Sequence, residues 1–93
     1  MKLWLISQTV NNDYDTYSDA VVAADTRTEA RHFHPGGIER QYRDGAWQIM
    51  RKDGSYFSPC DTWASPEQVK AELLGTAKKD TKAGVICSSF HAG

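Results

Sequence analysis

The stretch that decides the fold is the first ten residues, Met1-Lys2-Leu3-Trp4-Leu5-Ile6-Ser7-Gln8-Thr9-Val10. Side chains alternate between the two faces of a β-strand, so Leu3 and Leu5 lie on one face. Trp4 and Ile6 lie on the other. A strand that is apolar on both faces is typical of the middle of a sheet with cover above and below. The sequence therefore predicts a core that begins at the first residues of the chain.

The length and composition are those of one small globular domain. The chain has 93 residues, of which 40% are hydrophobic and 25% charged, an ordinary balance for a soluble domain. No apolar run approaches the roughly 20 residues that cross a bilayer, so we expect no membrane association. The net charge of −1 argues against a general nucleic-acid binder, which usually carries a basic excess.

The cysteines and the amino-terminal residues indicate a cytosolic protein. There are two cysteines, Cys60 and Cys87, fewer than a secreted disulfide scaffold of this size usually has. The apolar run after Met1 stops at Ser7, far short of the apolar core of a signal peptide. We expect both thiols to be reduced, and the sequence leaves a disulfide between them open.

A second strand and a helix are predicted next. Residues 20–24, Ala-Val-Val-Ala-Ala, indicate a short strand antiparallel to the first. Thr26 and Glu29 then have the spacing of a capping box, in which the threonine hydroxyl accepts from the Glu29 amide. The predicted helix runs to about His32 and ends before Pro35-Gly36-Gly37.

The centre of the chain predicts a β-hairpin, and the segment after it is ambiguous. Residues 47–51 and 55–57 flank Lys52-Asp53-Gly54, and an Asp-Gly pair between such runs is typical of a hairpin turn. Ser65-Pro66-Glu67-Gln68 has the pattern of a helix start, which local propensity extends to Leu74. The alternative is one turn followed by a strand over 69–77, with Val69, Ala71 and Leu73 facing the core. Residues 84–90 indicate a final strand.

Three segments of the chain together have the pattern of a known group of proteins. They are Lys2 to Gln8 with the loop from Asn11 to Tyr17, then Ala23-Ala24-Asp25-Thr26 leading into Glu29-Ala30-Arg31 and His34-Pro35, and finally Leu74-Gly75-Thr76-Ala77 with Gly84 to Phe90 and Ala92-Gly93. Together they resemble a group of small bacteriophage and prophage proteins with no established activity. The resemblance covers about the first thirty-five and the last thirty residues, and residues 36–60 are longer than the group has. It favours the strand over 69–77, and it implies the host bacterial cytosol.

The predicted fold is a single α+β domain over residues 1–93. It has a mostly antiparallel sheet of the first, second, 69–77 and last strands, one main short helix packed on a face, and a central β-hairpin excursion. One short helix is too small to bury the whole apolar face that carries Trp4 and Ile6. Either the hairpin at 47–57 with Trp63 covers them, or a second copy of the chain does, so a homodimer is one expectation.

Two sets of residues have some features of metal sites, and neither matches a metal-binding pattern. The candidate zinc ligands match no zinc spacing: His32, His34, Cys60, Cys87 and His91. The calcium-like series is Asn11, Asp13, Asp15 and Asp19. An EF-hand loop would need glycine and glutamate where this chain has Thr16 and Val22. We therefore predict no metal and no cofactor.

The leading candidate for partner binding is the loop with Asp13, Tyr14, Asp15 and Tyr17. Exposed tyrosines among polar groups suit recognition, because they bury much area at little cost in conformational entropy. The alternative is that one or both rings fold back onto the sheet.

The candidate nucleic-acid segment interleaves cations with aromatic rings, as single-strand binding requires. Its residues are Arg40, Tyr42, Arg43, Trp47, Arg51 and Lys52. Glu39, Asp44 and Asp53 dilute its charge, so a solvated hairpin explains the segment better.

No catalytic motif is present, and Cys87 within an apolar strand suggests an inert core thiol. The sequence therefore predicts a non-enzymatic phage or prophage accessory protein that binds a protein partner of the host or phage. Its rival is a nucleic-acid-associated protein that uses the central segment.

Overall fold

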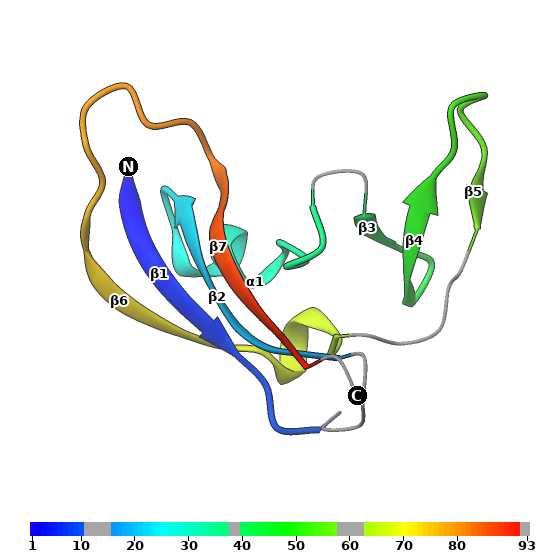
Figure 1. Ribbon diagram of the computed structural model, residues 1–93, viewed down its shortest axis with the longest axis horizontal. Helices are drawn as coiled ribbons and strands as arrows, with labels where there is room; N and C mark the ends of the chain where they lie inside the picture. Colours follow the sequence, from blue (N-terminus) through cyan, green and yellow to red (C-terminus); the bar gives the residue numbers. More distant parts are fainter. Residues whose placement is uncertain (11–15, 38–39, 58–62, 92–93) are drawn as a thin grey trace.

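The first strand, β1 (Lys2–Ser7), lies inside a four-stranded antiparallel sheet (Figure 1). It pairs with β2 (Thr16–Ala24) on one side and with β6 (Lys70–Thr76) on the other. β7 (Gly84–His91) lies beyond β2, so the strand order is β6-β1-β2-β7. The structure is a computed structural model and describes residues 1–10, 16–37, 40–57 and 63–91. The central place predicted for the first strand is confirmed.

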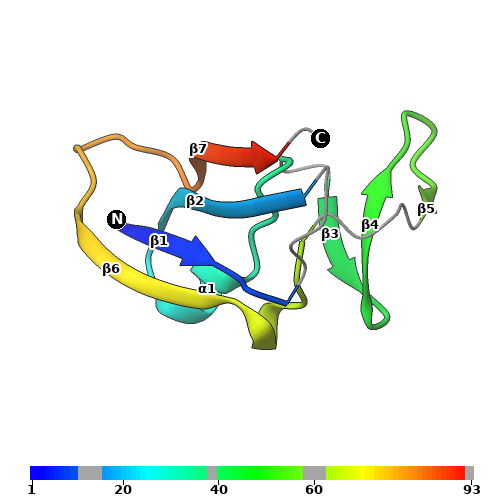
Figure 2. The same cartoon turned by 60° about the horizontal axis from the view of Figure 1, so that its bottom comes forward.

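A smaller antiparallel sheet stands beside this main sheet (Figure 2). It contains β3 (Arg40–Arg43), β4 (Ala46–Met50) and β5 (Tyr56–Phe57), in that order. The fold is thus mostly antiparallel sheet with one short helix, as predicted, although the hairpin excursion has three strands. None of the described helices is long and apolar enough to cross a membrane.

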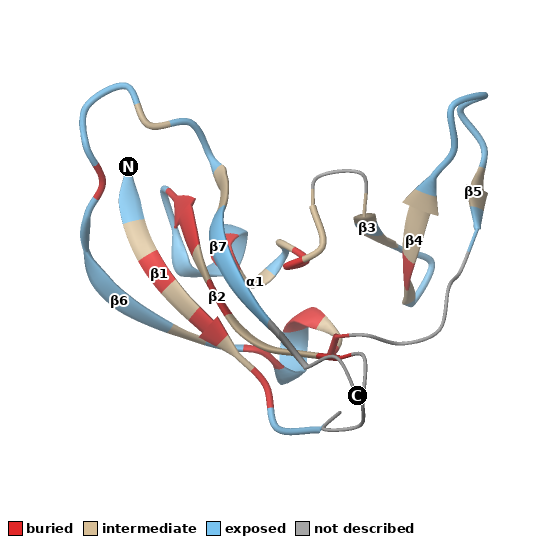
Figure 3. Ribbon diagram, viewed as in Figure 1, coloured by how far each residue is buried: buried red, intermediate tan, exposed pale blue. Residues whose placement is uncertain are grey.

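One face of the main sheet forms the core. The side chains of Trp4, Ile6 and Val22 are almost fully buried there, as the middle of β1 and β2 shows in Figure 3. The Trp4 indole N–H donates to the Ala24 carbonyl at 3.0 Å, which satisfies the polar atom of a buried ring. Ala30 of the helix belongs to the same cluster, so the helix packs on this face.

The helix, α1 (Arg27–Arg31), begins as the capping pattern predicts. The Thr26 side chain accepts from the Glu29 backbone N–H at 3.1 Å, so it replaces a partner that the first turn lacks. His32 is the C-cap residue, and Phe33 packs against the edge of the core. A helix this short owes its stability to docking on the sheet.

The opposite face of the main sheet differs from the prediction. Leu3, Leu5 and Val21 lie on it and are half-buried, and none of the described helices or strands covers them. We call this surface, with Ala23 and the residues that flank it on β6 and β7, the open face. The expectation that β1 has cover on both faces is therefore wrong for the described part of the chain. The stripe that lacks cover is Leu3 and Leu5 rather than Trp4 and Ile6.

The segment after Ser65 adopts the turn-plus-strand alternative. A single 3-10 turn, η1 (Pro66–Gln68), leads directly into β6, where local propensity favours a helix. Pairing with β1 satisfies the backbone along the whole segment, and such tertiary pairing overrides a weak local preference. Val69 is buried as expected, but Leu73 is 50% exposed. The register puts Leu73 opposite Trp4 on the core face, as predicted, but its side chain stays half exposed because β6 is an edge strand with a neighbour on one side only.

Candidate functional site

A buried histidine joins the two sheets. His34 follows α1 and is 2% exposed. Its ring packs edge-on against Tyr17 of the main sheet and Trp47 of the small sheet, with centroid distances of 5.7 and 5.1 Å. Trp63 lies 6.5 Å from it. We call these four rings the His34 cluster. This cluster packs the small sheet against the main sheet.

The imidazole of His34 is neutral in this setting. The Gly36 backbone N–H donates to Nδ1 at 2.8 Å, which places the ring proton on Nε2. Burial and, secondly, the positive charge of Arg40 lower the pKa of His34 to about 3. A charged imidazolium would have to lose its water and lie near a guanidinium, so the ring acts as a packing and hydrogen-bonding group.

Trp47 fastens the small sheet to this cluster. Its ring is buried, and its indole N–H donates to the Ala64 carbonyl at 2.7 Å. Tyr42 of β3 meets it edge-on at 5.4 Å. Because β4 carries Trp47 at its beginning, the other end of β4 and all of β5 extend beyond the cluster.

Two tight turns shape the small sheet. Asp44 and Gly45 both have positive φ, 52° and 80°, which is the pattern of the two-residue turn favoured in β-hairpins. This first hairpin, β3–β4, was not among the predicted elements, although the Asp-Gly pair at 44–45 is the signal for it. The predicted second hairpin, around Lys52-Asp53-Gly54, is confirmed by the pairing of β4 with β5.

The second turn uses the carboxylate of Asp53. The Ser55 hydroxyl and backbone N–H donate to its Oδ1 at 2.6 and 2.9 Å. These hydrogen bonds hold the pKa of Asp53 below its usual value. The carboxylate is thus engaged within its own turn.

The face of the small sheet that lies away from Trp47 presents stacked polar and aromatic groups. The Arg43 guanidinium lies 4.1 Å from the centroid of the Tyr56 ring. The Tyr56 hydroxyl reaches the Gln41 side chain at 3.4 Å, and the Gln48 amide donates to the Arg43 carbonyl at 2.9 Å. The register places these groups on one face with Met50, which is 43% exposed. We call this surface the Arg43–Tyr56 face.

A second cation–ring pair lies at the far end of the sheet. The Arg51 guanidinium lies 4.6 Å from the Phe57 ring centroid, and Phe57 is 37% exposed. The described cations of this sheet and its turns are Arg40, Arg43, Arg51 and Lys52, against the carboxylates of Asp44 and Asp53. The small sheet is therefore locally basic in a chain of net charge −1.

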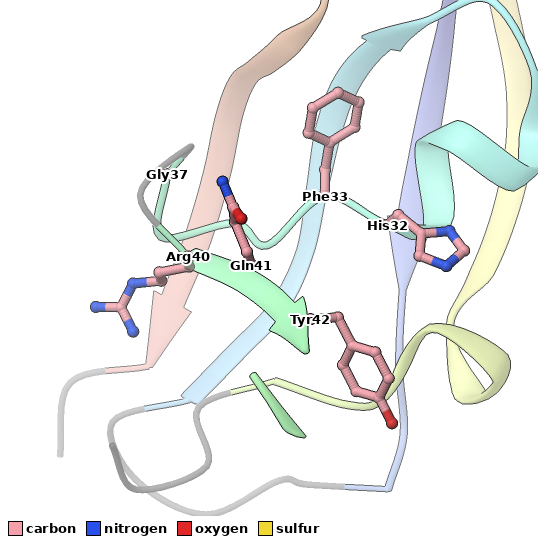
Figure 4. A pocket seen from close by; sticks show the side chains of 6 residues that line it. All are labelled: His32, Phe33, Gly37, Arg40, Gln41 and Tyr42. Carbon is pink, nitrogen blue, oxygen red and sulfur yellow. The ribbon is translucent and has the colours of Figure 1, made fainter. Parts of the chain in front are cut away.

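A shallow groove lies between the end of α1 and β3 (Figure 4). Its volume is about 220 Å³, and it is lined by His32, Phe33, Gly37, Arg40, Gln41 and Tyr42. Figure 4 shows the Arg40 and Tyr42 side chains extending in different directions from β3. The groove is open to solvent and is continuous with the small sheet, so it widens the surface available for contact.

Of the four residues predicted to bind a partner, the structure describes only Tyr17. Asp13, Tyr14 and Asp15 lie outside the described residues. Tyr17 packs against the core and against His34, so the expectation of an exposed recognition ring is wrong for Tyr17. The ring folds back because β2 begins at Thr16, earlier than the predicted strand, and carries Tyr17 into the cluster.

The predicted nucleic-acid residues lie in one small sheet but not on one face. The register puts Arg40 and Tyr42 on the side of Trp47 and Arg43 on the opposite side. Five of them lie on or beside β3 and β4, namely Arg40, Tyr42, Arg43, Arg51 and Lys52. Trp47 is buried, so the prediction that its ring offers a face for stacking bases is wrong. The accessible rings are those of Tyr56, which is half-buried, and Phe57, which is exposed. Neither was predicted as a site residue, although both follow the predicted turn.

The candidate metal ligands do not converge in the described part of the chain. His32 is exposed, with Nδ1 2.7 Å from the Thr28 carbonyl, whereas His34 is buried in its cluster. No group of three or more His, Cys, Asp or Glu residues there could hold a metal ion. Cys87 is exposed, so the expectation of a buried thiol is wrong; it lies on an edge strand. Cys60 falls outside the described residues.

No protein-family model matches this chain, and neither a curated protein nor a solved structure matches it.

Proposed function

We propose that this chain is a non-enzymatic binding protein whose small sheet recognises an acidic surface on a protein partner. The observation that carries the proposal is the pair of rings on the edge strand β5, each stacked with an arginine. The half-buried Tyr56 stacks with Arg43, and the exposed Phe57 stacks with Arg51 on the opposite face of the sheet. Arginine, tyrosine and methionine are the side chains that protein interfaces favour. All three occur on the Arg43–Tyr56 face.

The charges of the small sheet and its turns indicate the chemistry of the partner. Four cations face two carboxylates, and the hydrogen bonds from Ser55 occupy Asp53. A guanidinium held on a ring still offers its N–H groups in the plane, in the geometry that carboxylates accept. A partner that presents aspartate or glutamate side chains around an apolar centre would match both the cations and the rings.

The resemblance to phage and prophage proteins supplies the setting. It supports an accessory role in the bacterial cytosol, where the partner is a host or phage protein. The described residues offer no assembled catalytic group that would favour an enzyme.

The nucleic-acid alternative rests on the same cations, and the ring geometry favours it less. Single-strand binding needs ring faces on which bases stack. Trp47 is buried, and one face each of Tyr56 and Phe57 lies under a guanidinium. We therefore expect weak binding to single-stranded DNA at physiological salt.

The test starts with the tagged full chain in a bacterial lysate, with and without phage infection. A captured protein is identified and its affinity is measured by calorimetry. We expect Arg43→Glu with Arg51→Glu to weaken that affinity at least tenfold, because the two cations become repulsive toward an acidic surface. The expected affinity of the native chain falls as salt rises.

Lys78→Glu with Lys79→Glu is the matched control, since it makes the same change of charge on the exposed connection from β6 to β7. These variants should bind as the native chain does. An affinity that both pairs of variants lower equally would contradict recognition by the small sheet. Single-stranded DNA bound more tightly than any protein, with loss in the arginine variants, would establish the alternative.

A further inference from the structure

The open face of the main sheet is an apolar surface with a polar rim. Its centre consists of the half-buried Leu3, Leu5 and Val21 on the two middle strands, next to Ala23, which is fully buried. Apart from the glycines, the residues that the register pairs on this face from β6 and β7 are polar or are the exposed Cys87: Lys70, Glu72, Cys87 and Ser89. The unpaired bulge residues of the two strands, Leu74 and Ile86, are apolar and are 52% and 54% exposed. A desolvated apolar centre within a polar rim is the anatomy of a protein interface.

The surface is free of steric obstruction at its glycines. Gly75 and Gly84 flank Leu3 and Ala23 in one row across the four strands. A Cβ built on either glycine meets no atom within 4 Å. A second layer could therefore approach this end of the sheet closely, as packed sheets do at a separation of about 10 Å.

We propose that a second copy of this chain covers the open face, so that two main sheets pack into a symmetric sandwich. The twofold axis runs along the strands, between β1 and β2. It places β1 of each copy opposite β2 of the other, so Leu5 of one copy meets Val21 of the second. The apolar centre of one copy thus packs on the apolar centre of the other, as the interface of a twofold dimer requires.

The rim charges are complementary under the same symmetry. Lys70, Ser7 and Asp19 lie in one row, on three successive strands. The axis brings Asp19 of the second copy opposite Ser7, one strand away from Lys70. A lysine side chain can span that distance, and two such Lys70–Asp19 contacts form in each dimer. Within one copy, neither residue has an ion pair among the described residues.

The available area suits a modest dimer. Four strands at a spacing of about 4.8 Å and six residues at about 3.3 Å each give a projected area of roughly 400 Å². Side-chain relief increases the accessible area, so two copies together bury on the order of 1,000 Å², near the lower limit for specific interfaces. We therefore expect a dimer that dissociates at micromolar concentrations.

Sedimentation of the full chain over a range of concentrations tests this inference. We expect the native chain to shift from 10.4 kDa to twice that mass, and Leu5→Glu to remain monomeric. Phe57→Glu is the matched control, because it adds the same charge at an exposed ring of the small sheet and should leave the dimer intact. Circular dichroism establishes that each variant is folded.

Reversal of the rim charges tests the symmetry itself and leaves the sheet centre untouched. Lys70→Glu and Asp19→Lys should each weaken dimerisation about fivefold or more, and the double variant should recover most of the native affinity. A native chain that stays monomeric at about 1 mM would overturn the inference, as would a dimer that Leu5→Glu leaves unchanged. Partner capture by the small sheet is measured separately, so either proposal can fail alone.

Discussion

Trp47→Ala is expected to lower the free energy of unfolding by about 3–5 kcal/mol. The substitution removes a buried ring that packs against His34 and Tyr42, and it also removes the donor to the Ala64 carbonyl. For a domain of this size, each kcal/mol corresponds to a shift of roughly 4–8 °C in melting temperature. Thermal and urea unfolding, followed by circular dichroism, measure the effect.

Two further variants separate the causes. Trp47→Phe keeps most of the ring and leaves the Ala64 carbonyl without its donor, so we expect a smaller loss of about 1–3 kcal/mol. Phe57→Ala removes an exposed ring from the same sheet and should cost no more than about 1 kcal/mol. A Trp47→Ala variant as stable as Phe57→Ala would show that Trp47 does not hold the two sheets together.

Mild acid is the second condition with a large expected effect. The pKa of His34 is lowered to about 3 in the folded chain, from 6.5 for an unperturbed histidine. Between those two values the unfolded chain binds a proton that the folded chain does not. Stability is therefore fully present above pH 6.5 and is lost as the pH falls toward 3. The slope from this one group is about 1.4 kcal/mol per pH unit.

Urea unfolding at pH 6.5 and at pH 5.0 measures this loss, which we expect to reach about 1.6 kcal/mol for His34 alone. The His34→Asn variant is the control, because its amide oxygen can accept from the Gly36 N–H and does not titrate. We expect its stability to change by less than half as much over the same interval. Titration of the His34 ring near pH 6.5 in the folded chain, observed by NMR, would contradict a buried neutral imidazole.

Local patterns in the sequence are sufficient for several elements. The alternating apolar residues of β1, the Thr26–Glu29 capping pattern and the Asp53-Gly54 turn each act over a few residues. The first hairpin was predictable by the same means, since Asp44-Gly45 is an equally good turn signal. Each of these patterns determines local backbone conformation, which depends little on the remainder of the chain.

The candidate site was predictable only as a segment. The cations and rings between Arg40 and Phe57 are visible in the sequence, but their partners are not. Register decides that Arg43 stacks on Tyr56 and that Trp47 points inward to the His34 cluster. An aromatic residue in a strand is equally compatible with either face until a second layer exists, so no local pattern separates Trp47 from Tyr56.

Sequence patterns are sufficient to predict that β1 is a central strand, where α1 begins and where the second hairpin turns. Three further features depend on the tertiary structure: the strand at Lys70–Thr76 in place of a helix, the packing of Tyr17 against the buried His34, and which face of β1 stays open. The physical reason is the separation along the sequence of the residues that interact. Capping and turn formation depend on neighbours a few residues away, whereas strand pairing and burial depend on residues brought together from distant parts of the chain.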